Sequence, residues 1–387
     1  MTSTDFASVD AFQSNLEEIA QLADDSERNS TLDALWQNLM DEGKIPYIVG
    51  VVVAFVYRGE VSDSVLVQGD WTWFVRATEP GQPIVAEPIA GTDVWLGRGQ
   101  FPADARLDYK LVVDDVWILD PANPRTQRSG FGDNSMFAMP DYVPSPSSQV
   151  RPEVAQGTLG EDQVITSAVL GYDVNYRVYV PAGYDALADL PVLYITDGHE
   201  YLHTEMGKTT IVLDNLIADG QIPPTMAVFV DPRDVNTGDN QRYAQYFEEP
   251  AKTAEFFAEE LVPAIDSAYT TMAAATHRAI VGTSFGGKFS TFTCFHHPDT
   301  FGLCLIQSPD APHAETAEII QDSELLPVRI ALHTGTVGDF LAEPRGLRDL
   351  LVSKGYAPFY LEVSQGHSWG NWSDVLDEML IALLAAK

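Results

Sequence analysis

The pattern of apolar and polar positions changes near residue 150. Before that point, β-branched and aromatic runs are broken by Gly, Asp and Pro, which predicts short strands within 48–59, 64–75, 92–99 and 107–121. Such strands at this spacing are typical of an immunoglobulin-like β-sandwich. Further upstream, within residues 1–43, apolar residues recur at helical spacing, which predicts a helical segment in front of the sandwich.

After residue 150, predicted strands alternate with predicted helices. The segment "AVLGYDVNYRVYVP" alternates as a strand pair, and 190–198 is a continuous apolar run typical of a buried parallel strand. Further strands are predicted at 225–231, 277–284, 301–308, 328–335 and 356–366. Helices are expected between and after them at 209–224, 250–269, 285–298, 343–355 and 372–386. Repeated strand–helix units predict an α/β fold with a doubly wound, mostly parallel sheet.

The stretch "PSPSSQVRPEVAQG" is rich in Pro and Ser and has no apolar periodicity, so we expect a linker there. Four segments follow from this boundary. They are a helical segment at 1–43, a β-sandwich domain at 44–143, a linker at 144–157 and an α/β domain at 158–387.

The stretch "IVGTSFGG" carries the strongest chemical signal. It places Ser284 between Gly282 and Gly286, after a predicted buried strand and before a predicted helix. In this context G-x-S-x-G predicts a nucleophile at a sharp turn, where the glycines avoid Cβ clashes. The backbone amide of Phe285 would then face the site where an oxyanion develops.

A serine nucleophile needs a base and an acid that orients it. His367 follows the last predicted strand on a glycine loop and is the expected base. Asp339 is the first carboxylate beyond strand 328–335 and the expected acid, with Glu343 as the second choice and Asp310 as a weaker one.

Two further contributions to the site are expected from loops. The amide of His199, which follows Asp197 at the end of strand 190–198, is positioned as a second oxyanion donor. Trp369 and Trp372 lie beside His367 in the sequence and either line a substrate pocket or pack in the core.

Several segments of the second domain resemble the enterochelin (enterobactin) esterase family, within the esterase D-like branch of the α/β-hydrolases. The matching segments include "RVYVPAGYDALADLPVLYITDGHEYL", "GTSFGGKFSTFTCFHHPDTFG" and "SQGHSWGNW". The first domain is similar to the β-sandwich that precedes the catalytic domain in these esterases. The resemblance covers roughly residues 45–387 and implies an α/β-hydrolase domain with such a sandwich in front.

By position, the resemblance implies Ser284 as nucleophile, His367 as base and Asp339 as its partner. Arg242 in "QRYAQYF" corresponds to a family arginine near the site. It would organise the "ITDG" loop, meet an acidic substrate group, or form a structural ion pair. The implied activity is hydrolysis of carboxylic esters, with a catecholate siderophore trilactone as the preferred substrate.

Charge and composition restrict the partners. The chain of 387 residues has 56 acidic and 22 basic residues and a formal net charge of −34, which disfavours nucleic acid and anionic membranes. The same field would repel an anionic ferric catecholate unless the cleft is locally basic. A small-molecule ester is the expected partner, and the oligomeric state stays open, with a homodimer as one option.

Location and cofactors follow from what the sequence lacks. Without a long apolar run or a basic, apolar leader we expect a cytoplasmic protein that spans no membrane. Cys294 and Cys304 have no metal-binding spacing and are expected in the core, so neither a metal nor an organic cofactor is expected.

Two alternatives remain. One is a feruloyl or acetyl esterase acting on polysaccharide-derived esters. The other is a non-catalytic carbohydrate-binding protein, in which Trp71 and Trp73 would share one face of a strand and stack on sugar rings.

Overall fold

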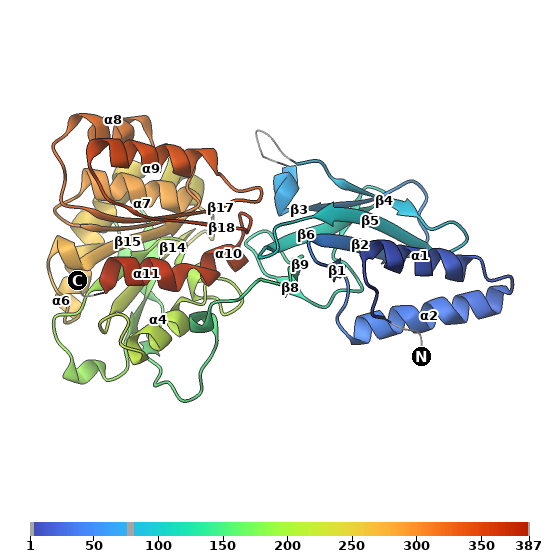
Figure 1. Cartoon of the computed structure of the whole chain (residues 1–387). Coiled ribbons are helices and arrows are strands. Elements are labelled where there is room, and N and C mark those ends of the chain that lie inside the picture. Colours follow the sequence, from blue (N-terminus) through green and yellow to red (C-terminus); the bar gives the residue numbers. More distant parts are fainter. Residues whose placement is uncertain (1–3, 76–80, 386–387) are drawn as a thin grey trace. The chain divides into compact units, whose positions relative to one another are not determined.

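A computed structural model describes residues 4–75 and 81–385 (Figure 1). The chain divides into two units. The first comprises Met1–Val143 together with Thr336–Asp339 and Val363–Gly370, and the second comprises Pro144–Gly335, Phe340–Glu362 and Asn371–Lys387.

The second unit is built on a mixed sheet with the strand order β10-β12-β14-β13-β15-β16-β17-β18, in which β11 also pairs with β12. Strands β13 to β17 form parallel pairs, whereas β12 runs antiparallel to β10, β11 and β14. The bounds are β10 Thr158–Leu159, β11 Gln163–Thr166, β12 Asp173–Val180, β13 Val192–Ile195, β14 Met226–Asp234, β15 Arg278–Thr283, β16 Leu303–Gln307, β17 Arg329–Gly335 and β18 Phe359–Val363.

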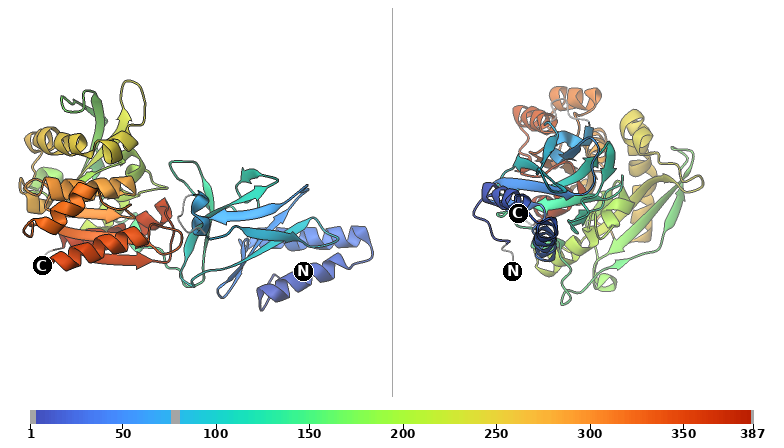
Figure 2. Two further views of the ribbon diagram at one scale, coloured as in Figure 1. Left: turned by 90° about the horizontal axis from the view of Figure 1, so that it is seen from above. Right: turned by 90° about the vertical axis from the view of Figure 1, so that its right-hand side faces the viewer.

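Helices cover both faces of this sheet. Helices α4 and α11 lie on one face, and α7, α8 and α9 lie on the other (Figures 1 and 2). The helix bounds are α3 Gly198–Leu202, α4 Thr209–Ala218, α5 Pro250–Glu255, α6 Val262–Ala268, α7 Phe285–His296, α8 Ala314–Asp322, α9 Ala342–Lys354, α10 Trp369–Asp374 and α11 Leu376–Leu384. The predicted helix 250–269 is continuous but contains a π-helical segment, Phe256–Leu261, between α5 and α6.

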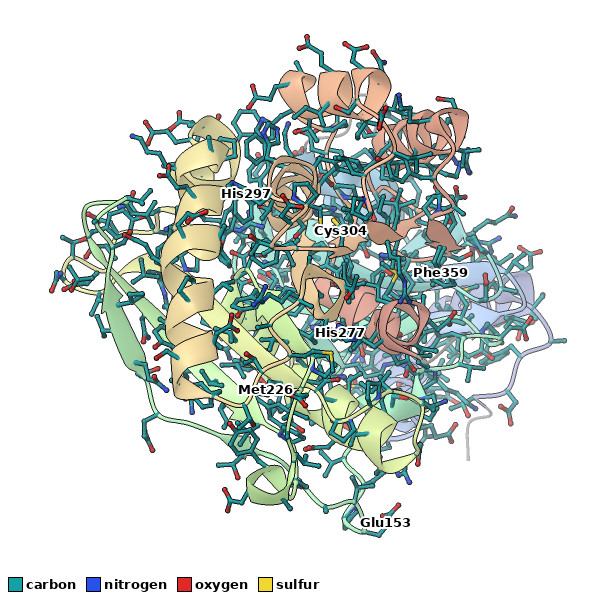
Figure 3. All side chains as sticks on the ribbon, turned by 90° about the vertical axis from the view of Figure 1, so that its left-hand side faces the viewer. Glu153, Met226, His277, His297, Cys304 and Phe359 are labelled. Atoms are coloured by element: carbon teal, nitrogen blue, oxygen red, sulfur yellow. The ribbon has the colours of Figure 1, made fainter. Side chains whose placement is uncertain are left out.

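The parallel strands determine at which edge of the sheet functional side chains can come together. Figure 3 looks onto the end of the sheet where Met226 and Phe359 begin β14 and β18 and where His277 directly precedes β15. Because parallel strands share their direction, the loops after β13, β15, β16 and β17 leave from the opposite edge. Ligands of such sheets bind outside the carboxyl ends of the strands. Cys294 and Cys304 are fully buried inside this unit, as predicted.

The first unit is an antiparallel sheet with the order β1-β2-β5-β4-β3-β6-β9-β8 and β7 beside β6. Strand β4 pairs with β5 on one side and with β3 on the other. Phe55 of β2 and Tyr109 of β6, from different halves of the sheet, share one apolar core. The bounds are β1 Tyr47–Val49, β2 Val52–Arg58, β3 Val65–Gly69, β4 Ile84–Pro88, β5 Val94–Gln100, β6 Arg106–Val113, β7 Val116–Ile118, β8 Thr126–Gln127 and β9 Asn134–Ala138.

The N-terminal helices form part of this unit. Helix α1 (Val9–Ala20) begins at the N-cap Ser8, and α2 (Asp25–Asp41) begins at the N-cap Asp24. Their buried faces pack in one cluster with β1, β2 and β5. Phe12 of α1 stacks on Tyr47 of β1 at 4.5 Å between ring centroids.

Two sequence-based interpretations change locally. Strand β3 ends at Gly69, and Asp70–Val75 forms a 3₁₀ helix, because the Thr72 hydroxyl donates to the Gly69 carbonyl and closes a turn. Trp71 therefore does not stand on a strand face with Trp73, and its ring instead packs against Phe101. The Trp73 side chain lies outside the described part.

The segment expected to be a linker is ordered against the second unit. Ser145, Ser147 and Ser148 are buried, and Pro146–Ser148 forms a short 3₁₀ helix. The Asn215 amide of α4 donates to the carbonyl oxygen of Ser147 at 2.8 Å, and the Ser145 hydroxyl donates to Asp377. The low apolar periodicity of residues 144–157 therefore reflects irregular backbone packed on the second unit and not a flexible linker.

Candidate active site

Ser284 occupies a strained turn between β15 and α7. Its φ of 57° and ψ of −121° are unusual for a residue with a side chain. The turn is so tight that a Cβ on Gly282 would lie 2.2 Å from the Gly286 carbonyl oxygen, and one on Gly286 would lie 2.4 Å from the Thr196 hydroxyl oxygen. Both glycines are therefore required by close approach, and this is the strand–turn–helix context in which G-x-S-x-G acts as a nucleophile turn.

Helix α7 starts directly after Ser284. The first amides of a helix have no partner within the helix, and they carry the positive end of its dipole. Phe285 supplies the first of these amides. The Phe285 amide therefore lies where it could stabilise a developing negative charge, which is the role that the sequence predicts for it.

The loop after β13 is held next to this turn by Arg242. The Arg242 Nε donates to the Asp197 carboxylate at 2.8 Å, and its Nη2 donates to the Thr283 carbonyl oxygen at 3.2 Å. Burial disfavours the guanidinium charge, but Asp197, together with Tyr246 and Glu200, raises the pKa of Arg242 overall. Three roles were considered for Arg242. This geometry fits both organisation of the "ITDG" loop and a structural ion pair, and contact with a substrate remains a prediction.

His199 lies in the first turn of α3, where its amide is also near a helix start. Gly198 allows this loop to approach β14, since a Cβ there would lie 2.4 Å from the carbonyl carbon of Phe229. The His199 imidazole Nδ1 lies 3.6 Å from an Asp231 carboxylate oxygen. Burial is the main reason that the pKa of His199 is lowered, and the nearby Asp231 opposes this change.

His367 and Asp339 form a close polar pair among the predicted site residues. The His367 Nδ1 and the Asp339 Oδ1 are 2.7 Å apart, and the Asp339 side chain is fully buried. Asp339 follows β17 and His367 follows β18, each by four residues. An ionised carboxylate at Nδ1 selects the tautomer with its proton there and leaves Nε2 as the acceptor.

The other carboxylates considered as the acid lie elsewhere. Glu343 is in the first turn of α9, and Asp310 forms an ion pair with Lys288 at 3.4 Å. Ser284 belongs to the second unit, while Asp339 and His367 lie in segments that group with the first. That Ser284 acts with this pair stays a prediction.

Trp369 and Trp372 are packed rather than open. They are 2% and 7% exposed. The Trp372 indole donates to the Ser308 hydroxyl at 2.9 Å, and the Trp372 carbonyl accepts from Gln307 at 2.8 Å. This burial matches the packing interpretation, and a role in lining a pocket remains untested.

An aromatic cluster beside Ser284 went unnoticed in the sequence. Tyr243 stacks on Phe247 at 5.0 Å, and the Phe285 ring lies 5.8 Å from the first and 5.4 Å from the second. The Lys288 ammonium lies 4.5 Å from the centre of the Phe247 ring. The i, i+4 spacing of Tyr243 and Phe247 in "QRYAQYF" was the available signal.

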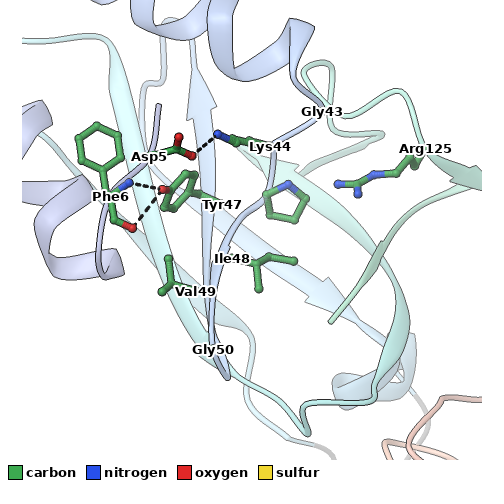
Figure 4. Close-up of a pocket in the computed structure, with 10 residues that line it drawn as sticks. Asp5, Phe6, Gly43, Lys44, Tyr47, Ile48, Val49, Gly50 and Arg125 are labelled. Carbon is green, nitrogen blue, oxygen red and sulfur yellow. Dashed lines mark hydrogen bonds and ion pairs between the residues drawn. The ribbon is translucent and has the colours of Figure 1, made fainter. Parts of the chain in front are cut away.

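A pocket of about 440 Å³ on the first unit includes none of these residues (Figure 4). Its Lys44 is paired with Asp5 at 2.6 Å and with Glu42 at 2.7 Å, and its Arg125 donates to the Ile45 carbonyl oxygen. The cations are therefore engaged internally. In the part of the chain that the structure describes, no three His, Cys, Asp or Glu side chains gather as a metal site.

Comparison with known proteins identifies the family. Residues 167–383 match the family model described as "Putative esterase", which is more than half of the chain. The chain belongs to this esterase family. It is a carboxylic ester hydrolase.

Three curated relatives are similar to this esterase. Protein YjcH of Bacillus subtilis (strain 168) is 27% identical over 59% of this chain and 98% of its own length. An endo-1,4-beta-xylanase/feruloyl esterase of Xylanibacter ruminicola is 27% identical over 54% of this chain and 29% of its own. The iron(III) enterobactin esterase of Escherichia coli O6:H1 (strain CFT073) is 26% identical over 62% of this chain and 64% of its own. The matches therefore span less than two thirds of the latter two proteins.

The fold of this esterase also matches a solved one over most of its length. The crystal structure of ferric enterobactin esterase from Salmonella typhimurium aligns with a TM-score of 0.71 at 21% identity, covering 86% of this chain and 93% of that one. At this identity the likeness concerns the fold alone. Within the described residues, no helix combines the length and the apolar character needed to cross a bilayer.

Proposed function

We propose that this esterase works through a Ser–His–Asp triad and an acyl-enzyme. Ser284 attacks the ester carbonyl, His367 Nε2 takes the hydroxyl proton and returns it to the leaving alcohol, and Asp339 holds the imidazole. Water, activated by His367, then releases the acid and restores the serine. The strained turn at Ser284 is the observation that carries this proposal, and the 2.7 Å contact between His367 and Asp339 supports it.

Two amides are proposed to stabilise the oxyanion. Phe285 contributes from the start of α7 and His199 from the first turn of α3. Such a donor contributes on the order of 3 kcal/mol to transition-state stabilisation. The chemistry proposed here needs protein groups and water alone.

We infer an α/β-hydrolase domain for residues 158–387 and an immunoglobulin-like sandwich for 44–143. The strand order of the second unit and the core shared by β2, β3, β6 and β9 in the first support these assignments. A cytoplasmic location and a small-molecule partner remain part of the same proposal.

The preferred substrate is a bulky aromatic acyl ester, with a catecholate siderophore trilactone as the leading candidate. The cluster of Tyr243, Phe247 and Phe285 beside Ser284 supports an aromatic group, because rings pack on rings. The Lys288 ammonium, which is paired with Asp310 at 3.4 Å, places a positively charged group beside the Phe247 ring in an acidic protein. Relatives named as enterobactin esterases support the same class.

A feruloyl ester is the second candidate, supported by the relative named endo-1,4-beta-xylanase/feruloyl esterase. Both substrates share an aromatic acyl group, so the aromatic cluster does not separate them. The carbohydrate-binding alternative loses its main support, since Trp71 packs in the core of the first unit.

A hydrolysis panel tests this function. Wild type and Ser284→Ala are compared by mass spectrometry on p-nitrophenyl butyrate, methyl ferulate, and enterobactin with and without iron. We expect wild-type cleavage of an aromatic ester and a loss of roughly three to six orders of magnitude in kcat/KM in Ser284→Ala.

The panel also separates the candidates. Cleavage of enterobactin that depends on Ser284 supports the siderophore, and cleavage of methyl ferulate alone moves the enzyme to the feruloyl esterases. Wild-type rates retained by folded Ser284→Ala would contradict the serine mechanism.

A further inference from the structure

The segments that carry Asp339 and His367 are joined to each other. The Thr336 amide donates to the Val363 carbonyl oxygen at 2.8 Å, and the Val337 amide donates to the Gln365 carbonyl oxygen at 3.2 Å. A displacement of one segment is therefore transmitted to the other.

One buried residue, Asp70, lies against both segments. A Cβ on Gly366 would lie 2.1 Å from the Asp70 Cγ, and a Cβ on Gly338 would lie 1.7 Å from the Asp70 carbonyl oxygen. Only glycine fits at such distances. Gly366 precedes His367 and Gly338 precedes Asp339, so Asp70 contacts the backbone directly before each member of the pair.

Asp70 is also held in place by a buried polar network within the first unit. It is 1% exposed, and its Oδ2 accepts the Asp108 amide proton at 2.7 Å. The Asp108 carboxylate accepts from Arg106 Nη1 at 2.6 Å, and Arg106 Nη2 donates to Gln127 at 2.7 Å. Connected networks of this kind make a core rigid.

Arg106 extends the same support past His367. It forms a parallel β-bridge with Gln365, and a Cβ on Gly370 would lie 2.0 Å from its Nη1. The loop Gln365–Gly370 thus meets the network before and after the imidazole.

The network is also coupled electrically to the pair. Burial raises the pKa of Asp70 well above its usual range, the negative charges of Asp108 and Asp339 raise it further, and the Asp108 amide and Arg106 oppose the change. The interaction with Asp339 agrees with the contact at Gly338.

We propose that Asp70 is a positioning residue of this esterase, whose side chain and backbone hold the loops before His367 and Asp339 so that the imidazole and carboxylate stay in contact. Asp70 is assigned a positioning role, exerted mainly through its contacts with these two loops. The inference rests on the proposed function, because it presumes that His367 and Asp339 are the base and its partner.

Two substitutions of Asp70 and one control test it. Asp70→Ala removes the carboxyl group, whereas Asp70→Asn keeps the shape and the oxygen that accepts the Asp108 amide. Asp120→Ala is the matched control. Asp120 is also a buried carboxyl of the first unit, 2% exposed, but it accepts from Tyr109 and Ala122 and not from the network around Asp70.

The kinetic result should separate positioning from stability. A small misplacement of a catalytic group costs up to about 100-fold, so we expect kcat of Asp70→Ala to fall roughly 10- to 100-fold at a KM within about threefold. Asp70→Asn should recover most of kcat. Asp120→Ala should lower the melting temperature while the folded fraction keeps the wild-type kcat.

An NMR readout makes the test independent of turnover. In the Ser284→Ala background, the Nδ1 proton of His367 should give a downfield resonance, identified by its absence in His367→Gln. We expect Asp70→Ala to broaden or lose this resonance and Asp120→Ala to retain it. Retention of both kcat and the resonance in Asp70→Ala would overturn the inference. If Asp70→Ala loses the resonance but wild type cleaves no ester, the positioning role is kept and only the proposed function is refuted.

A second pair of variants applies if Asp70→Ala does not fold. Gly366→Ala pushes on Asp70 from the loop side, and Gly346→Ala, whose Cβ would meet no atom within 4 Å, is its control. We expect kcat to fall by about one order of magnitude or more for Gly366→Ala only. Equal kcat in both variants would contradict the assigned role.

Discussion

At the scale of single residues, the backbone of Ser284 holds the most unusual conformation near the site. A non-glycine residue in such a region costs about 1–3 kcal/mol, and the surrounding structure must compensate. Here the Ser284 amide donates to the Gln307 carbonyl oxygen at 2.9 Å, and α7 begins at the next residue. The strained backbone conformation of Ser284 is therefore maintained by the elements on both sides of it. This arrangement suits the proposed nucleophile, whose hydroxyl would have to stay above the edge of the sheet.

The choice of acid is also a question about single residues. We expect Asp339→Asn to lower kcat by roughly two to four orders of magnitude, because the amide no longer selects the Nδ1–H tautomer of His367. Glu343→Gln, four residues further along, should change kcat by less than about twofold, as an ordinary surface substitution does. Steady-state kinetics of both variants on the best ester, with melting curves as a folding check, make this comparison. A larger effect from Glu343→Gln would transfer the acid role to Glu343.

At the scale of elements, the site depends on where strands end and what fixes those ends. Strand β18 leads to His367, and it is tied to α9 by Arg345, which donates to both carboxylate oxygens of Glu362 at 2.8 and 2.7 Å. The Tyr360 hydroxyl donates to the same carboxylate at 2.6 Å. Bidentate geometry of this kind restricts both partners.

This ion pair predicts a pH-dependent stability. The hydrogen bond from Arg345 is the main cause that lowers the pKa of Glu362 from 4.5 to about 2. A carboxyl with a lowered folded-state pKa stabilises the fold above its unfolded pKa and loses this contribution as the pH falls through the folded value. We expect Glu362→Gln to reduce the folding equilibrium constant roughly two- to fivefold at pH 7, a small effect because the pair is partly exposed.

The difference between Glu362→Gln and wild type should shrink as the pH falls from about 4.5 toward about 2. Urea unfolding curves at several pH values measure it. A difference that stays constant over this range would contradict the assigned ion pair.

At the scale of the whole molecule, charge sets the conditions for binding. A net charge of −34 makes the average field repulsive for anions, while Lys288 and Arg242 are cations close to the Ser284 turn. Salt screens the long-range field over about 8–10 Å at 0.10–0.15 M but weakens short, partly buried contacts less. The balance between the two should therefore depend on ionic strength.

A salt series tests this balance. For an anionic catecholate ester we expect kcat/KM to rise about three- to tenfold between low salt and 0.5 M NaCl. For neutral p-nitrophenyl butyrate the value should stay nearly constant, which controls for effects of salt on the enzyme. A decrease for the anionic ester would mean that local attraction dominates the approach of the substrate.

Much of this protein could be predicted from local sequence. The alternation of buried strands and helices follows from periodicity over ten to twenty neighbouring residues, and it located most strands of the second unit. The turn at Ser284 is equally local, since its glycines, its strand and its helix are adjacent in the chain. The expected chain order of serine, acid and histidine restricted the candidates for the acid to three carboxylates, Asp339, Glu343 and Asp310.

Only the tertiary structure decided which distant residues meet. The contact of His367 with Asp339 joins two loops 28 residues apart, and the contacts of Asp70 with Gly338 and Gly366 join positions more than 250 residues apart. Burial of Trp369 and Trp372 and the ordering of 144–157 likewise depend on partners elsewhere in the chain. Periodicity reports how a segment meets its own neighbours, whereas side-chain pairing and burial are set by the packing of elements that the sequence lists far apart.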